Sequence, residues 1–116
     1  NIGPAEITRR RRSAVGVTSF TVIIAIAIVA AGLPQLARLA IFPFAAASAV
    51  SWLQVIRRFC VGFAAAGIQN FGALGAQERI ADDAARAADR RRASLMTLEG
   101  AAYAAIVTGI LVVLPI

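Results

Sequence analysis

The sequence has no histidine, no lysine and only one cysteine, Cys60. Because histidine and cysteine are the usual ligands of zinc, haem and iron–sulfur clusters, sites for these groups are not expected. Acid–base chemistry through histidine is excluded for the same reason. We therefore predict no catalytic residues, no metal site, no cofactor and no enzymatic activity. Cys60 follows two arginines, which favours a reactive thiolate, but a small apolar filler is the more common role of a lone cysteine.

Acidic side chains are almost absent from the long apolar runs. Glu99 is the only acid within or close to one of them. An ionisable residue inside a membrane is costly and often functional, so Glu99 is the candidate functional acid. It falls at the mouth of its run, where the carboxylate can reach water, lipid headgroups or an arginine. Proton or cation transport would place an acid near the middle of the bilayer, and the other two runs contain none.

The apolar runs themselves predict an all-α integral membrane protein with three transmembrane helices. Hydrophobic residues make up 59% of the chain and its mean hydropathy is +0.77, which is hard to reconcile with a soluble domain of this length. A helix of about 20 residues spans the hydrocarbon of a bilayer. Three runs approach this length within a single membrane domain, 1–116: 14–33, 39–56 and 98–116.

The arginines are distributed unequally around these runs. If all three cross a bilayer, eleven of the twelve arginines lie on one side and only Arg38 lies on the other. Since such a bias marks the cytoplasmic side, the basic segment 1–13 is predicted inside and the C-terminus outside. Basic residues that flank apolar runs face anionic lipid more simply than nucleic acid. The residues expected at lipid headgroups are Arg9, Arg10, Arg11, Arg12, Arg57 and Arg58.

A secretory signal peptide is the other interpretation of the first apolar run. A basic segment precedes that run and small residues follow it. The apolar part of a cleaved signal is usually about 7 to 15 residues, however, and this run approaches 20. We therefore interpret 14–33 as a membrane span.

The segment 57–75 is glycine-containing and only weakly apolar. If it crossed the membrane, the arginines would divide into six inside and six outside, and the bias would vanish. It is therefore predicted to stay inside, as an inward helical extension of the second span, an interfacial helix or a shallow re-entrant turn. The helical extension is favoured.

The segment 76–96 is predicted to form a charged cytoplasmic helix. Opposite charges follow one another at helical spacing, as in Arg79 with Asp83 and Asp82 with Arg86. This helix either folds back on the extension as a helical hairpin or contacts a partner, and the hairpin is favoured because glycines before it allow a reversal. No residue between 94 and 98 interrupts a helix, so we expect it to continue into the third span.

Small residues recur every four positions in the spans. In the third span these are Ala101, Ala105 and Gly109, with Gly100 and Ala104 beside them, and Ala45 and Ala49 repeat the pattern in the second. Small residues at this spacing let two helix backbones approach closely. Packing among the chain's own helices and packing on another subunit explain the pattern equally well.

Two functions remain in competition. The preferred one is a non-catalytic accessory subunit of a larger bacterial inner-membrane complex, because the spans lack midplane charge. The alternative is a small homo-oligomeric transporter or channel that uses Glu99, Gln54 and the serines of the second span. Arginine without lysine, together with abundant alanine, is typical of a GC-rich bacterial genome. With the three predicted spans, this indicates a multi-pass protein of the bacterial cytoplasmic (inner) membrane.

Overall fold

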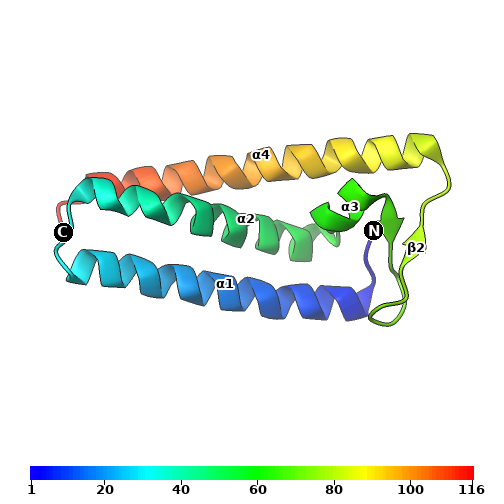
Figure 1. The fold of residues 1–116 in the computed structure, drawn as a ribbon, viewed down its shortest axis with the longest axis horizontal. Coiled ribbons are helices and arrows are strands. Elements are labelled where there is room, and N and C mark those ends of the chain that lie inside the picture. The colour runs from blue at the N-terminus through cyan, green and yellow to red at the C-terminus, as the bar shows by residue number, and fades with distance from the viewer.

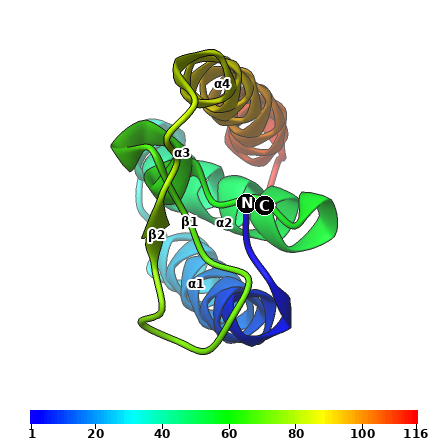
Figure 2. The same cartoon turned by 90° about the vertical axis from the view of Figure 1, so that its right-hand side faces the viewer.

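Three long helices run side by side in the computed structural model, which describes residues 1–116 and measures 52 × 25 × 17 Å. Figure 1 and the end-on view in Figure 2 agree that α2 lies between α1 and α4. The three helices therefore form an open layer, with α2 in contact with both neighbours. The long helices are α1 (Pro4–Ala30), α2 (Ile41–Arg57) and α4 (Asp83–Val113). The shorter elements are η1 (Gln35–Ala40), α3 (Val61–Ala66), β1 (Ile68–Gln69) and β2 (Glu78–Arg79).

The three predicted spans are confirmed as helices that are long and apolar enough to cross a membrane. These helices are α1, η1 continued by α2, and α4. Many of their large apolar side chains point away from the layer and are more than half exposed, among them Ile23 and Ile26 of α1 and Ile106 and Ile110 of α4. Such a surface suits contact with lipid tails or with other membrane helices, and it is typical of a multi-pass membrane protein.

Helix α1 begins earlier than the predicted span. Gly3 precedes its first turn and Pro4 opens the helix, where the missing N–H of a proline costs little. The four arginines after residue 8 therefore belong to the first turns of α1. Its other end is set by Gly32, which has a φ of +68°, and by Pro34, which fixes the start of η1.

Polar side chains of α1 and α2 meet inside the apolar part of the layer. The indole nitrogen of Trp52 donates a hydrogen bond of 2.8 Å to the hydroxyl of Thr18. The hydroxyls of Thr21 and Ser48 lie 3.1 Å apart, and each also reaches a backbone carbonyl. These contacts fix the register of the two helices, because a hydroxyl or indole N–H seeks a partner inside an apolar environment.

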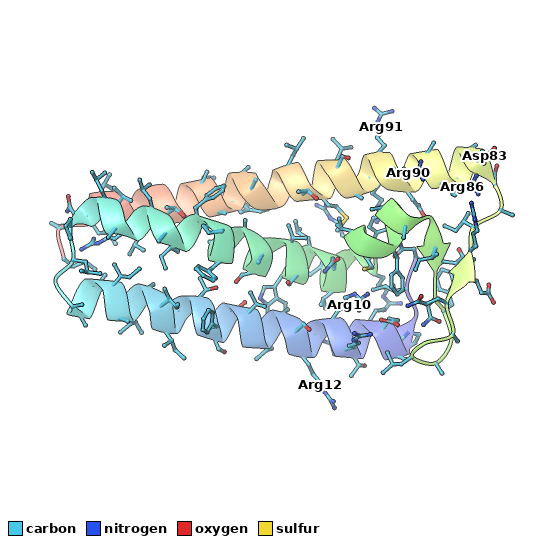
Figure 3. The ribbon with its side chains drawn as sticks, in the orientation of Figure 1. Arg10, Arg12, Asp83, Arg86, Arg90 and Arg91 are labelled. Carbon is cyan, nitrogen blue, oxygen red and sulfur yellow. The ribbon has the colours of Figure 1, made fainter.

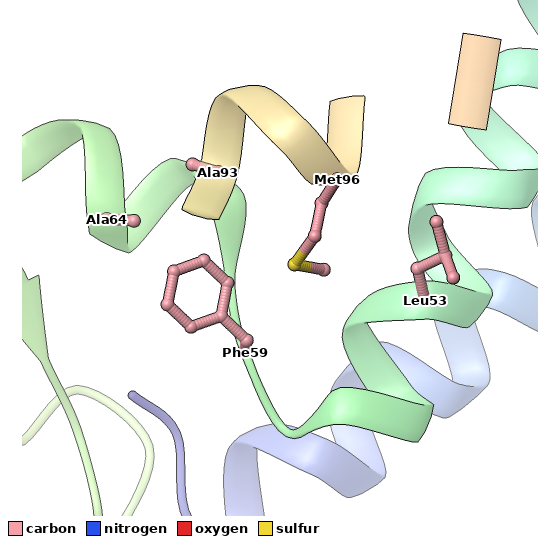
Figure 4. Packing of buried hydrophobic residues seen from close by; sticks show 5 residues of the cluster. All are labelled: Leu53, Phe59, Ala64, Ala93 and Met96. Carbon is pink, nitrogen blue, oxygen red and sulfur yellow. The ribbon is translucent and has the colours of Figure 1, made fainter. Parts of the chain in front are cut away.

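The helical extension predicted for 57–75 is wrong. α2 ends at Arg57 because Arg58 turns into the left-handed conformation with a φ of +53°. This turn folds Phe59 back against α4, where its side chain is only 1% exposed. Burial of a phenylalanine contributes about 1.5–3 kcal/mol, which offsets the roughly 1–2 kcal/mol that the left-handed conformation costs. Figure 4 shows the ring of Phe59 between Ala64 of α3 and Met96 of α4.

The predicted cytoplasmic hairpin of two long helices is replaced by a smaller arrangement, because α3 has only six residues and packs on α4 after the chain reverses through a short ribbon. β1 and β2 pair as a short antiparallel ribbon, with Ile68 opposite Arg79. The charged helix predicted for 76–96 starts only at Asp83, since the carboxylate of Asp82 accepts a hydrogen bond from the backbone N–H of Ala84 and caps the helix. Asp82 is therefore a cap rather than an ion-pair partner.

The predicted continuity between the charged segment and the third span is confirmed. α4 runs without interruption from Asp83 to Val113. Its first turn is held by Arg86, which forms an ion pair with Asp83 and donates a hydrogen bond of 2.6 Å to the carbonyl oxygen of Ile80. The start of α4 is thereby tied to the ribbon that precedes it.

Candidate functional site

Helix α4 carries two rows of small residues on different faces. The inner row consists of Gly100, Ala104 and Thr108, which are buried against the layer. At Gly100 the approach to α2 is so close that an added Cβ would lie 2.5 Å from Cγ2 of Val50. Ala104 packs with Ala45 of α2 in one apolar cluster. The inner row therefore joins α4 to α2.

The outer row consists of Ala101, Ala105 and Gly109. Each of them is one position beyond a member of the inner row, which rotates it by about 100° around the helix. Ala105 and Gly109 are exposed, and Ala101 is half-buried. An added Cβ on Gly109 would meet nothing within 4 Å. The outer row is thus left uncovered by the chain's own helices at Ala105 and Gly109.

The small residues predicted in α2 divide between these two roles. Ala45 is buried and packs within the layer, whereas Ala49 is only half-buried. The sequence places Gly100 and Ala104 beside the outer row, but it does not show which of the two rows faces α2. That choice depends on how α4 is rotated about its axis, which is set by the burial of Met96 and Phe59 at one end of the layer.

Glu99 lies on a third face of α4 and is paired with the end of α2. Its carboxylate is 2.6 Å from the guanidinium of Arg57 and accepts a further hydrogen bond of 3.4 Å from the hydroxyl of Tyr103. Both side chains of the pair are about one third exposed. Arg57 is the only charged group that is bonded to Glu99. The pair therefore joins the end of α2 to the middle of α4.

A second group of polar side chains, here called the polar cluster, joins the start of α1 to the connection between α2 and α4. It consists of Glu6, Arg10, Cys60 and Asn70. Glu6 is fully buried, with its carboxylate 2.9 Å from Arg10 and 3.1 Å from the amide nitrogen of Asn70. Arg10 donates another hydrogen bond of 3.0 Å to the sulfur of Cys60. A buried carboxylate is tolerated here because charge and hydrogen bonds surround it.

Glu6 is not predicted as a site residue from the sequence, because it precedes the first apolar run, in a segment whose composition is that of a solvated tail. The available signal was its spacing, since it lies four residues before Arg10 and therefore on the same face of a helix. Cys60 is buried and contacts Arg10 rather than the adjacent Arg57 or Arg58. The predicted cationic neighbourhood of this thiol is thus supplied by a residue 50 positions away.

Most of the arginines gather at one end of the layer, around the start of α1, the ribbon and the start of α4 (Figure 3). Among those expected at lipid headgroups, Arg9, Arg11, Arg12 and Arg58 are exposed. Figure 3 shows Arg12 pointing away from α1. Arg10 differs, because it turns inward and lies 5.0 Å from the ring centre of Phe63.

Arg38 lies at the opposite end and is only 3% exposed. Its guanidinium donates hydrogen bonds of 2.8 and 3.0 Å to the carbonyl oxygens of Leu111 and Leu114, and it also contacts the carbonyl oxygen of Ile116. The last carbonyls of a helix have no partner within the helix and carry partial negative charge. Arg38 therefore caps the C-terminal end of α4 and joins it to η1.

Comparisons with protein-family models, with characterised proteins and with solved structures find no match to this chain.

Proposed function

We propose that this chain is a non-catalytic accessory subunit of a larger bacterial inner-membrane complex, and that the outer row packs on a transmembrane helix of a partner subunit. The observation that carries the proposal is the open layer, in which α1 and α4 flank α2 while Ala105 and Gly109 of the outer row stay exposed. In lipid, close packing of small residues is a main source of helix association. The outer row offers such a surface where the chain itself does not use it.

The topology of the proposal follows from the arginine-rich end. That end contains the start of α1, the ribbon and the start of α4, and we place it in the cytoplasm because basic residues mark the inner side of bacterial membrane proteins. The loop before η1 and the end of α4 then lie outside. Arg38, the exception in the charge pattern, is engaged by the carbonyl oxygens at the end of α4.

The polar groups that a transporter would need are engaged within the chain, which supports the accessory role. Glu99 is paired with Arg57. The side-chain oxygen of Gln54 accepts a hydrogen bond of 2.9 Å from the backbone N–H of Val61. The hydroxyl of Ser51 is bonded to its own helix. A shared pathway through several copies would have to break these contacts.

The experiment is purification of the tagged protein from its native membrane in mild detergent, with mass spectrometry of the intact particle. We expect different, larger subunits at fixed stoichiometry. Ala105→Leu and Gly109→Leu should reduce this co-purification at least tenfold, because leucine on the outer row prevents close helix contact. Ala27→Leu, an exposed small residue of α1, is the matched control and should leave it unchanged.

Glu99→Gln separates the two functional classes. In an accessory subunit this change leaves the complex and its activity intact. A pure homo-oligomer whose transport is abolished by Glu99→Gln would overturn the proposal and establish the transporter instead.

A further inference from the structure

A groove between α3 and α4 has a volume of about 560 Å³ and is open to the outside. Its apolar floor is formed by Val61 and Ala65 on the α3 side and by Ala93 of α4. Arg90, Ser94 and Thr97 line the α4 side. A hollow that combines an apolar floor with one cation and two hydroxyls suits an amphipathic anion.

The groove lies at the depth of lipid headgroups if α4 crosses the membrane. Leu98, at one end of the groove, is 66% exposed and starts the apolar part of α4. Ser94 and Arg90 precede Leu98 by one and two helical turns, which places them about 6 and 12 Å further toward the cytoplasm. The headgroup region is about 5–8 Å thick on each side of the hydrocarbon, and the long side chain of an arginine can reach back into it.

Arg90 is the charged group of the groove that has no counter-charge. It takes part in none of the three ion pairs of the chain. Two neighbouring arginines already have other partners. Arg86 pairs with Asp83, and the guanidinium of Arg92 lies 4.6 Å from the ring centre of Phe59. Arg91 points away above α4, outside the groove (Figure 3). Arg90 alone is therefore placed to bind an anion over the apolar floor.

We propose that this groove binds one anionic phospholipid, with the phosphate held by Arg90 and the hydroxyl of Ser94 and with the acyl chains entering the hydrocarbon over Leu98. Charge complementarity identifies the ligand class, because arginine matches the oxygens of a phosphate diester and the chain carries a net charge of +6. The inference rests on insertion of α4 into a membrane. It does not require the partner subunit of the proposed function.

The test is native mass spectrometry of the purified full chain, titrated with phosphatidylglycerol and, separately, with phosphatidylcholine. We expect one molecule of phosphatidylglycerol to remain bound with at least tenfold preference over phosphatidylcholine. Arg90→Gln should weaken this binding about tenfold, which corresponds to about 1.4 kcal/mol. Arg91→Gln removes the same charge one residue away and should change it less than twofold. Equal losses in both variants would show an unspecific charge effect and would overturn the proposal.

Two further measurements separate the lipid from other occupants. Ala65→Leu adds an apolar side chain to the floor without changing charge, and it should also weaken binding of phosphatidylglycerol while the helical circular dichroism stays unchanged. Inorganic phosphate at millimolar concentration should not displace the lipid, and displacement would overturn the role of the acyl chains. A photo-crosslinker at position 94 should label lipid in native membranes. Crosslinking to a protein instead would overturn the proposal, while leaving the accessory function untouched.

Discussion

Gly100 of α4 and Val50 of α2 approach so closely that no side chain fits between them. An added Cβ on Gly100 would lie 2.5 Å from Cγ2 of Val50 and 3.3 Å from its backbone nitrogen. The contact lies at the first position of the inner row and sets the distance between the two helices there. Close contact of this kind strengthens the van der Waals attraction between the two helices, because more atoms reach their optimal separation.

Gly100→Ala is expected to destabilise the isolated protein. Overpacking costs about 1–3 kcal/mol, and the higher helix propensity of alanine offsets up to about 1 kcal/mol of it. The measurement is the free energy of unfolding in detergent by titration with a denaturing surfactant. Gly109→Ala is the matched control: it gains the same propensity without a clash, so it should be neutral or slightly stabilising. An unchanged free energy of unfolding in Gly100→Ala would mean that α2 and α4 are further apart than they are in the structure.

Glu6→Gln is expected to loosen the start of α1. The substitution keeps the shape of the side chain but removes its charge, which leaves Arg10 partly buried without a counter-charge, at a cost of about 1–3 kcal/mol. Hydrogen exchange at the backbone N–H of Gly3 reports the effect, because this group donates a bond of 2.7 Å to the carbonyl oxygen of Asn70. Faster exchange is expected there, while the middle of α4 remains protected. Unchanged exchange at Gly3 would contradict the role of the ion pair.

Phe59→Ala is expected to detach α3 from α4. Removal of a buried phenylalanine costs about 3–5 kcal/mol, and Phe59 is the largest fully buried side chain. Loss of stability should be accompanied by faster alkylation of Cys60, which follows Phe59 and is buried in the structure. Phe71→Ala serves as the control, since Phe71 is 62% exposed and its removal should change both measurements little.

Arg38→Gln is expected to fray the C-terminal end of α4. Three carbonyl oxygens lose their charged donor, which weakens the closure by about 1.5–3 kcal/mol. Hydrogen–deuterium exchange of the last two turns of α4 measures the effect. Arg38→Lys restores the charge but not the fork of donors, so it should recover only part of the protection. Full protection in Arg38→Gln would show that the carbonyls find other partners.

The apolar part of the fold could be predicted from sequence because the length of an apolar run alone identifies a helix that is long and apolar enough to cross a membrane. The three spans and the unbroken course from residue 94 into the last one are examples. The path from 57 to 82 could not be predicted in this way. It depends on one arginine that adopts a left-handed conformation, which composition does not indicate, and on burial of Phe59 against a helix more than 30 residues away.

The candidate site was predictable only in part. Spacing identified the small residues of α4, and the position of Glu99 near the arginine-rich end indicated that its carboxylate can reach an arginine. Spacing does not tell the inner row from the outer row, because the two differ by one position along the same helix. The polar cluster was missed because its members come from residues 6, 10, 60 and 70, and only the folded chain brings them together.

The central position of α2 has a consequence for the order in which the chain is assembled. α1 and α2 are joined by a connection of a few residues, so the two helices can pair as a hairpin before α4 has left the ribosome. Every residue of the polar cluster precedes Asp83, so its contacts can form before α4 is complete. When α4 emerges, the face of α2 that it must occupy is already in place. Each helix is thus added beside one that is present, and no inserted helix has to move aside for a later one.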